Sequence, residues 1–323
     1  MRIPLETAIA KLQNGEVVAI PTETVYGLAA NARNEDALRQ IYTIKQRPAD
    51  NPLIVHIGAA DQVKDWASEF PPLAQKLASA FWPGPFTLVL PAKDNVSRIV
   101  RAGEPTIALR VPAHPLALQL LQQSGLGLAA PSANRYTQLS PTTAAHVESG
   151  LGQDLPVLDG GACQVGIEST IVSVNGDDWQ LLRHGMITEA QIAEITGQPA
   201  KIAWKNLPKV PGQHLLHYSP KTPIKLFDCA ATLMQYQQNS QQSCAVLLIE
   251  DIKHHVRHDL VKSPLIIETV LLPKDPAVVA EKLYSVLHHL DSLHVGQLLV
   301  QSPPKAPEWL AILDRLTRAA HQD

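Results

Sequence analysis

The 323-residue sequence has few cysteines, few aromatic residues and almost no net charge. Its three cysteines, Cys163, Cys229 and Cys244, stand far apart, so a disulfide framework is not expected and a reducing setting fits. A formal net charge of −3 provides no strong field to attract nucleic acid or anionic membrane. No apolar run approaches the ~20 residues of a membrane helix, and residues 1–15 lack an apolar signal core. We therefore expect a cytoplasmic protein without membrane association.

The common nucleotide-binding and zinc-binding signatures are also missing. The sequence has no GKS or GKT ending of a phosphate loop, no GxGxxG, no HExxH and no CxxC. His254, His255 and His258 are not part of a Cys/His array with fixed spacing, so a solvated loop is favoured over a metal site. Spacing assigns no partner histidine to Cys163, which we interpret as a structural thiol.

Apolar residues make up 45% of the chain, enough for a sizeable core, and the length suggests about two domains of ~150 residues. Over residues 1–204, β-branched runs alternate with helical spacing, which predicts one α/β domain with a mixed sheet. The predicted strands are 17–20, 52–57, 86–91, 106–111, 127–130 and 169–174. The predicted helices are 35–46, 71–81, 114–123 and 188–196, with another beginning after Pro141.

Residues 205–223 break this alternation with four prolines and a glycine, which is typical of a linker. Nineteen extended residues span roughly 60 Å, so this linker is long enough to cross the active site of the first domain. Residues 224–323 then resume strand and helix alternation, with helices over 276–290 and 308–320. That pattern predicts a smaller, doubly wound domain with a parallel sheet.

Polar residues follow the first strong strand in PTETVYGL, residues 21–28. Thr22, Glu23 and Thr24 stand where the strand ends, and polar residues at strand ends often face a ligand crevice. The alternative is a capped turn in which these residues start a helix.

Two cations, Lys45 and Arg47, stand two residues apart in IKQRPADNPLIVHI, residues 44–57. Pro48 favours an extended stretch, and in an extended chain both side chains project to one side, where they suit a polyphosphate. Taken alone, the pair is better explained as a solvated surface pair. Asn51 and His56 lie just downstream, and His56 on its apolar strand is either a ligand or a satisfied core histidine.

Arg110 interrupts the apolar strand TIALRV, residues 106–111. A charge inside such a strand is costly unless it is paired, so Arg110 requires an anion. That anion is either an internal carboxylate or a carboxylate of the substrate, which a guanidinium binds through two parallel bonds.

Two loops carry small polar groups. Residues 127–146 place Ser132, Asn134 and Ser140 after a strand, where hydroxyl, amide and backbone N–H groups can bind phosphate or ribose oxygens. An ordinary turn is the alternative. Residues 159–172 form a Gly-rich loop that leads into Ser169, and glycine lets the backbone approach a ligand closely.

In order along the chain, these motifs resemble the YrdC-type threonylcarbamoyl-AMP synthase family in its longer, two-domain form. The similar segments are PTETVYGL, Lys45-x-Arg47 with NPLIVHI, FWPGPFTLVL, TIALRVPAHP, AAPSAN with SPT, IESTIV and LLRHG. The linker PGQHLLHYSP and the terminal APEWLAILDRLTRAA resemble the longer form as well. The resemblance implies a YrdC-like mixed-sheet α/β domain followed by a smaller Rossmann-like parallel α/β domain.

The resemblance also implies a reaction in which L-threonine, bicarbonate and ATP give threonylcarbamoyl-AMP and pyrophosphate. The product serves to modify the adenosine beside the tRNA anticodon, through downstream threonylcarbamoyl-transfer proteins, so that any contact with tRNA is indirect. Magnesium accompanies ATP, and no tightly bound organic cofactor is expected. The implied catalytic residues are Lys45 and Arg47. The implied ATP-binding residues are Lys45, Arg47, Asn51, Thr106, Ser132, Asn134, Ser140, Arg183 and Tyr218, and the implied threonine-binding residues are Thr22, His56, Arg110, Ala130 and Ser169.

Two other functions compete with this one. An RNA-binding module of the same fold is disfavoured by the balanced charge and by an aromatic content of only 5%, because stacking platforms and basic stripes are missing. A carbamoyl transferase of the hydrogenase-maturation type is disfavoured because its zinc-finger and acylphosphatase-like segments are not visible in the sequence.

Overall fold

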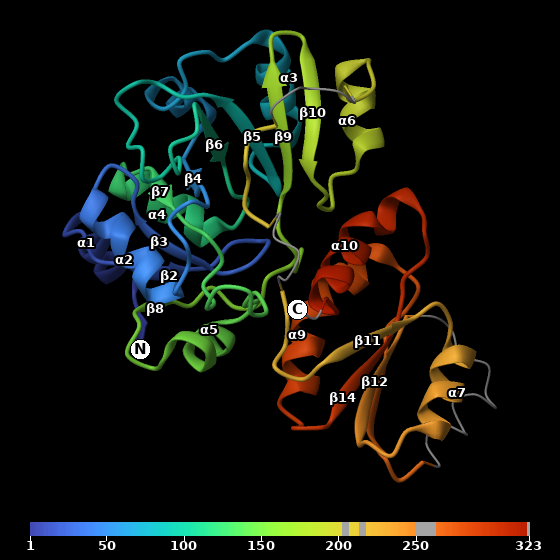
Figure 1. The fold of residues 1–323 in the computed structure, drawn as a ribbon. Helices are drawn as coiled ribbons and strands as arrows, with labels where there is room; N and C mark the ends of the chain where they lie inside the picture. Colours follow the sequence, from blue (N-terminus) through green and yellow to red (C-terminus); the bar gives the residue numbers. More distant parts are fainter. Residues whose placement is uncertain (202–206, 213–217, 250–262, 322–323) are drawn as a thin grey trace. The chain divides into compact units, whose positions relative to one another are not determined.

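The computed structural model describes residues 1–201, 207–212, 218–249 and 263–321. His254, His255 and His258 therefore lie outside the described residues. Backbone contacts divide the chain into two compact units. The first comprises Met1–Tyr136 and Ser140–His214, and the second comprises Thr137–Leu139 and Leu215–Asp323. Each unit is described below by itself (Figure 1).

The first unit is built on a mixed sheet in the order β1-β8-β2-β3-β7-β4-β6-β5-β9-β10. Its strands are β1 Arg2–Ile3, β2 Val18–Ile20, β3 Gly27–Asn31, β4 Ile54–His56, β5 Phe86–Pro91, β6 Thr106–Arg110, β7 Leu128–Ala129, β8 Val157–Leu158, β9 Thr170–Asn175 and β10 Asp178–Arg183. The central strands β4 and β6 run parallel, and β5 pairs with β6 in the antiparallel direction. The carboxyl ends of β4 and β6 therefore meet at one edge.

The helices of this unit begin and end where local chemistry predicts. They are α1 Leu5–Gln13, α2 Glu35–Lys45, α3 Pro72–Phe81, α4 Pro115–Ser124, α5 Ala144–Leu151 and α6 Glu189–Thr196, with a 3-10 turn η1 at Ala60–Asp65. Asn34 caps α2 by accepting from the N–H groups of Asp36 and Ala37, and Thr143 caps α5. Such caps satisfy N–H groups that have no partner inside the helix.

Strand alternation divides the apolar side chains between the two faces of the sheet. Along β2, Val18 and Ile20 pack with α1 and α4 on one face, whereas Ala19 joins the main core on the other. The main core also takes in buried residues of α2, α3, α5 and α6. Helices of this unit thus cover one face along most of the sheet, and α1 and α4 cover only part of the opposite face.

The remaining part of that opposite face is covered by the chain after α6. Ile54, Ala108 and Ile171 point to this side, and Val210 packs against them. In Figure 1 the segment containing Val210 runs along β5 and β9 rather than forming a helix over them. A sheet face covered by extended chain instead of a helix leaves room for polar side chains, and this is where the candidate site lies.

The second unit carries a four-stranded, wholly parallel sheet in the order β11-β14-β12-β13. Its strands are β11 Ile224–Phe227, β12 Cys244–Leu248, β13 Ile266–Leu271 and β14 Gln297–Gln301. Its helices are α7 Ala230–Asn239, α9 Pro276–Asp291 and α10 Leu310–Ala319, with a 3-10 turn η2 at Pro307–Trp309. Leu283 and Leu287 of α9 are fully buried.

The two α/β sheets, one mixed and one parallel, confirm the predicted fold class. The sequence prediction missed four short strands, β1, β3, β8 and β10, and two helices, α1 and α7. The domain limits at 204 and 223, and a linker crossing the site, remain predictions. Among the described residues, no helix is long and apolar enough to cross a membrane.

Candidate active site

Four predicted site residues share one face of the large sheet. His56 and Arg110 are paired neighbours at the ends of β4 and β6. They follow Ile54 and Ala108 by two residues, so they project to the face that Val210 covers. Ser169 precedes Ile171 by two residues and reaches the same side. Thr106 begins β6 on this face, four residues or about 13 Å of strand before Arg110.

Arg110 is held by three bonds from the protein. Its Nη2 donates to Glu23 Oε1 at 2.6 Å, its Nη1 to Thr24 Oγ1 at 2.8 Å, and its Nε to the Gly84 carbonyl at 3.1 Å. Only 4% of the Arg110 side chain and 7% of the Glu23 side chain are exposed, so the ion pair is buried. The internal carboxylate that the sequence left as one alternative is therefore Glu23. A guanidinium has five N–H groups, and two remain for a further acceptor.

Thr22 forms a capped turn, as one of the two sequence interpretations predicted. Its hydroxyl accepts from the N–H groups of Thr24 and Val25 and donates to the Val25 carbonyl at 2.6 Å. The predicted helix after this turn is wrong, because β3 follows it. These bonds draw the Thr22 hydroxyl into the turn that presents Glu23 and Thr24 to Arg110.

Lys45 lies under the loop that carries Ser132 and Asn134. Its Nζ donates to the Ser132 and Asn134 carbonyls at 2.6 Å each, and the residue is 1% exposed. Burial lowers the Lys45 pKa well below its usual range, the charge of Arg47 adds to this, and Glu168 opposes it. The Lys45 side chain therefore binds the backbone carbonyls of the loop that is predicted to hold the nucleotide.

The prediction that Lys45 and Arg47 stand on one extended stretch is wrong. Lys45 is the last residue of α2, and Gln46 closes the helix in the left-handed conformation with φ of 53°. Arg47 then turns back, its N–H donating to the Tyr42 carbonyl at 3.0 Å. The Arg47 Nη2 donates to the Pro52 carbonyl at 3.1 Å. The two cations still lie close enough for Arg47 to lower the Lys45 pKa.

A second polar cluster surrounds Ser169. Arg183 donates to the Ser169 carbonyl and hydroxyl and to the Pro211 carbonyl, and the Ser169 hydroxyl also lies 2.8 Å from Thr87 Oγ1. The cluster thus joins the start of β9 to the end of β10 and to the chain beside Val210.

Ser140 lies next to this cluster through Glu168. The Ser140 hydroxyl is fully buried and donates to Glu168 Oε1 at 2.6 Å. Because its proton points to the carboxylate, the Ser140 oxygen can only accept from a further group.

The other predicted site residues, for nucleotide and for threonine, lie at several places. Asn51 precedes β4, and its carbonyl accepts from the Tyr42 hydroxyl. Ala130 is 7% exposed, and its N–H donates to the Ile54 carbonyl. Tyr218 belongs to the second unit, where it lies 5.9 Å from the Tyr284 ring. Asn51 and Ala130 thus lie near the beginning of β4, and Tyr218 packs within the second unit.

His56 is a buried, neutral histidine. Burial and the nearby charge of Arg110 lower its pKa to about 3. Its Nδ1 is buried without a hydrogen-bond partner. A neutral imidazole therefore adds no second positive charge beside Arg110.

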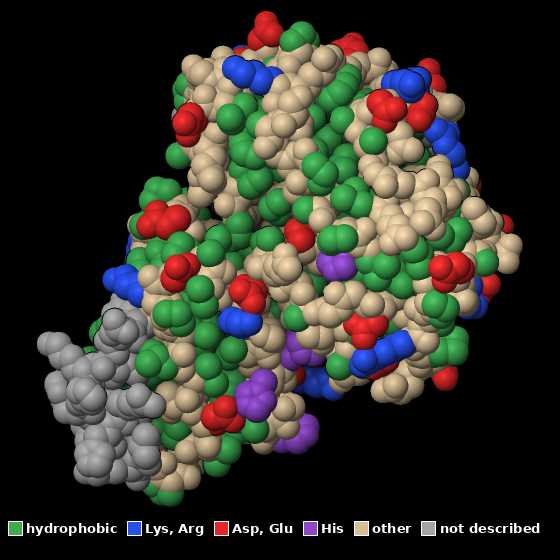
Figure 2. Space-filling model, turned by 180° about the vertical axis from the view of Figure 1, so that it is seen from behind, with side chains coloured by type: hydrophobic (Ala, Val, Ile, Leu, Met, Phe, Trp, Pro, Cys, Tyr) green, Lys and Arg blue, Asp and Glu red, His purple; other side chains and the backbone are tan. Residues whose placement is uncertain are grey.

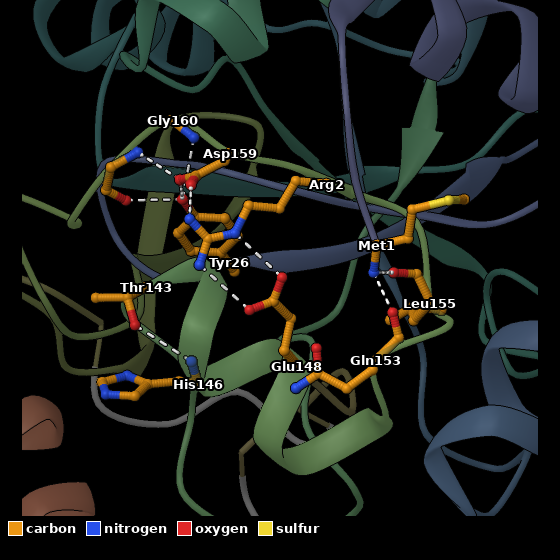
Figure 3. Close-up of polar contacts among 11 residues, drawn as sticks. Met1, Arg2, Tyr26, Thr143, His146, Glu148, Gln153, Leu155, Asp159 and Gly160 are labelled. Atoms are coloured by element: carbon orange, nitrogen blue, oxygen red, sulfur yellow. Dashed lines mark hydrogen bonds and ion pairs between the residues drawn. The ribbon is translucent and has the colours of Figure 1, made fainter.

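A hydrogen-bond network holds the Gly-rich loop in place (Figure 3). The Tyr26 hydroxyl donates to the Gly161 carbonyl at 2.7 Å and accepts from the Gly160 N–H at 3.1 Å. Asp159 accepts from the Gly161 N–H and from Arg2 Nη1 at 2.8 Å. The Val165 N–H then donates to the Glu23 carbonyl at 2.7 Å. The loop is thereby fixed beside the turn that pairs with Arg110.

The three cysteines differ in their exposure to solvent, and we expect thiol labelling to show this difference. Cys163 is buried and its thiol pKa is raised to about 12, mainly by burial, which agrees with a structural thiol. Cys244 is buried, whereas Cys229 is exposed with a lowered pKa because the Thr232 N–H and hydroxyl favour its thiolate. Ellman's reagent should modify Cys229 rapidly in the native protein and the other two only in urea. Rapid reaction in the native Cys229→Ser variant would contradict this assignment.

The roles of several residues of this site were not predicted from the sequence. Glu23 and Thr24 stood in a recognised motif but were not assigned as partners of Arg110. Glu168 and Thr87 carried no signal except polarity beside a strand. Each becomes visible only when strands distant in sequence are paired, as when β5 brings Thr87 to Ser169.

Comparison with known proteins agrees with these features along the chain. A family model described as "Telomere recombination" matches residues 10–185, and one described as "Threonylcarbamoyl-AMP synthase, C-terminal domain" matches residues 187–321. The Bacillus subtilis threonylcarbamoyl-AMP synthase is 42% identical over 97% of this chain and 92% of its own. The Schizosaccharomyces pombe synthase is 36% identical over 99% and 88%. This chain belongs to the threonylcarbamoyl-AMP synthase family.

A solved structure of the family extends the likeness to three dimensions. The crystal structure of Pyrococcus abyssi Sua5 complexed with L-threonine superposes with a TM-score of 0.86, at 31% identity, covering 99% of this chain and 96% of that one. The family resemblance is thereby confirmed, and the chain is an enzyme that forms an adenylate from ATP. Neither an RNA-binding module nor a hydrogenase-maturation transferase accounts for matches along both units.

Proposed function

We propose that this enzyme joins L-threonine, bicarbonate and ATP into threonylcarbamoyl-AMP and pyrophosphate, in the cytoplasm, for modification of the adenosine beside the tRNA anticodon. Downstream threonylcarbamoyl-transfer proteins would receive the product, so the chain itself needs no direct grip on tRNA. The observation that carries the proposal is the buried guanidinium of Arg110, which has two N–H groups left for a carboxylate and which would form an amino-acid half with His56. Lys45 and Arg47, beside the loop of Ser132 and Asn134, would form a phosphate half. An adenylate-forming enzyme must bring these two halves together.

The amino-acid half offers a fixed cation in a buried setting. The two spare N–H groups of Arg110 suit the threonine carboxylate, and their strength rises where water is excluded. Ser169 and the neutral His56 supply hydrogen-bonding groups beside it, and Thr22 and Ala130 contribute the adjoining turn and backbone. Because Arg110 is anchored to Glu23, little conformational entropy is lost when the amino acid binds.

The nucleotide half is formed by Lys45, Arg47 and the loop that Lys45 supports. Cations placed around a triphosphate offset the charge that develops as pyrophosphate leaves. The nucleotide itself would contact residues from the strands and loops around this sheet face. These are Asn51, Thr106, Ser132, Asn134, Ser140 and Arg183, with Tyr218 closing over it.

The described residues fit magnesium that arrives with the nucleotide rather than a metal caged by protein. They contain no group of three or more His, Cys, Asp or Glu able to hold an ion. Magnesium typically keeps several waters and binds substrate phosphates with one or two carboxylates. Glu168, which accepts from Ser140, is a carboxylate on the proposed nucleotide side. When bound, the ion would supply charge neutralisation on the phosphates.

The alternative function, an RNA-binding module, would require a different distribution of charge on the surface. A protein that grips RNA mainly through phosphates needs clustered lysine and arginine. The side seen in Figure 2 instead shows acidic and basic side chains interspersed. This distribution argues against RNA binding and so favours the synthase.

Exchange of labelled pyrophosphate into ATP tests the proposed function. We expect the purified protein to catalyse exchange only when L-threonine and bicarbonate are both present, because the mixed anhydride must form before pyrophosphate can attack it. Omission of either substrate is the matched control. Absence of exchange, with salt-sensitive RNA binding, would contradict the proposal.

A further inference from the structure

The loop that is proposed to hold the nucleotide is divided between the two units. Asn134 and Ser140 belong to the first unit, but the segment Thr137–Leu139 between them belongs to the second. Within the second unit, the Ser219 N–H donates to the Thr137 carbonyl at 2.8 Å, beside an isolated parallel bridge. The middle of the loop is therefore held by a backbone bond of the second unit, and the chain on either side carries the proposed nucleotide contacts.

Both segments of this contact have an uncommon backbone conformation. Thr137 has a φ of 67°, and Tyr218, which precedes Ser219, has a φ of 62°. The left-handed conformation is costly for residues with a side chain, above all for a β-branched one such as threonine. Such residues persist only where the surrounding contacts hold them, and they are concentrated at functional sites. Their occurrence on both segments of one contact indicates that the second unit imposes this conformation.

Tyr218 is anchored by two helices of the second unit. Only 1% of Tyr218 is exposed, and its ring centroid lies 5.9 Å from that of Tyr284 on α9. Arg315 of α10, also 1% exposed, lies over the same ring with its Cζ 5.0 Å from the centroid. Its Nη1 donates to Asp314 at 2.8 Å, so the buried charge is compensated while the guanidinium faces Tyr218. The attraction between a cation and an aromatic face is strongest where water is excluded, as it is here.

We propose that the second unit positions the nucleotide loop through a clasp, made of Thr137–Gln138 and Tyr218–Ser219, and that Arg315 fixes this clasp. The inference rests on the proposed place of the nucleotide at this loop. Arg315 acts through Tyr218 and is a positioning residue: it holds the Tyr218 ring, and the Ser219 N–H then holds the Thr137 carbonyl. The nucleotide thus meets a loop whose conformation is already fixed, and less conformational entropy is lost on binding.

Removal of the anchor should weaken the binding of ATP but not that of L-threonine. Arg315→Met is expected to raise the Kd for ATP about tenfold, through loss of a buried cation–π contact and release of a strained loop. The Kd for L-threonine should stay unchanged, because the bonds to Arg110 come from within the first unit. Calorimetry with each ligand alone measures both constants. Arg318→Met, which removes the other arginine of α10 that bonds to Asp314, is the matched control and should alter neither. An unchanged Kd for ATP in Arg315→Met would overturn the proposal.

Substitutions at position 137 test the left-handed conformation itself. Glycine adopts this conformation without the cost that threonine meets. In the Arg315→Met background, Thr137→Gly should therefore restore most of the lost ATP affinity, whereas Gln138→Gly, where the backbone is not left-handed, should not. Equal recovery with both glycines would contradict the clasp.

Proline provides a test that does not require a substitution in the core. In the otherwise unchanged enzyme, Thr137→Pro fixes φ near −65° and should raise the Kd for ATP about tenfold, with that for L-threonine unchanged. An unchanged Kd for ATP would overturn the proposal. If the variants behave as expected but the unchanged enzyme shows no exchange that depends on threonine and bicarbonate, the proposed function fails and the clasp stands.

Discussion

Arg110→Met is expected to lower the free energy of unfolding by about 3–5 kcal/mol, because it leaves the Glu23 carboxylate buried without its cation. The same change removes the cation proposed for the threonine carboxylate, so threonine-dependent exchange should fall below detection. Urea unfolding at pH 7 measures the first effect and pyrophosphate exchange the second. This is the largest change in stability that the described site predicts, since the Arg110 and Glu23 side chains are only 4% and 7% exposed.

A double variant separates the structural role of Arg110 from its role toward substrate. In Glu23→Gln with Arg110→Met, both charges are gone, and a buried ion pair replaced by neutral groups is often nearly as stable as before. We therefore expect most of the lost stability to return while exchange remains absent. Recovery of exchange in the double variant would show that Arg110 acts only on the fold. A single variant as stable as the unchanged protein would contradict the burial argument itself.

Arg110 shows which features of the site can be predicted from the sequence and which cannot. The mostly apolar run around it predicted a buried strand, and a charge in such a strand predicted an anion nearby. Both follow from local rules, since strand periodicity and the cost of an unpaired charge do not depend on distant residues. The identity of the anion did depend on them, because Glu23 lies 87 residues away along the chain. Sequence patterns alone provide no pairing across that distance.

Lys45 shows the opposite case, in which a local rule was misapplied. Pro48 disfavours helix for the residue before it, so Lys45 and Arg47 were predicted to share an extended stretch, although the helical spacing of residues 35–46 already included Lys45. The helix in fact ends at Lys45, and Gln46 takes the left-handed conformation that commonly closes helices. The chain turn therefore lies one residue earlier than the proline suggests. The two cations still act on one site, for a different geometric reason than the one predicted.

The sheet face behind the site explains why its remaining residues were hard to predict. The helical spacing of residues 188–196 predicted α6 well, because amphipathic helices carry a periodic signal. The segment around Val210 has no period, yet it covers Ile54, Ala108 and Ile171. Its Pro211 carbonyl also accepts from Arg183. Irregular chain that covers a functional face leaves no pattern in the sequence, only a proline-rich composition.

Arg47→Ala is expected to reduce adenylate formation about 100- to 1,000-fold, the loss typical of removing one preorganised charge from a site where charge develops. The fold should survive, because Arg47 lies beyond the end of α2 and its Nη2 donates to the carbonyl of Pro52, which is near in sequence. Initial rates of pyrophosphate exchange at saturating threonine and bicarbonate measure the effect, with thermal unfolding as the check on structure. Because the charge of Arg47 lowers the pKa of Lys45, the same variant should also raise that pKa.

Arg39→Ala provides the matched control for this prediction. Arg39 lies on the same helix, but its side chain is 57% exposed and pairs with Glu35 and Asp36 on the surface. Exposed pairs of this kind contribute about 0–1 kcal/mol, so both exchange and stability should stay close to those of the unchanged enzyme. A loss in Arg39→Ala equal to that in Arg47→Ala would point to general electrostatics rather than a specific site. Near-normal turnover in Arg47→Ala would remove Arg47 from the nucleotide half and leave Lys45 as the cation closest to the phosphates.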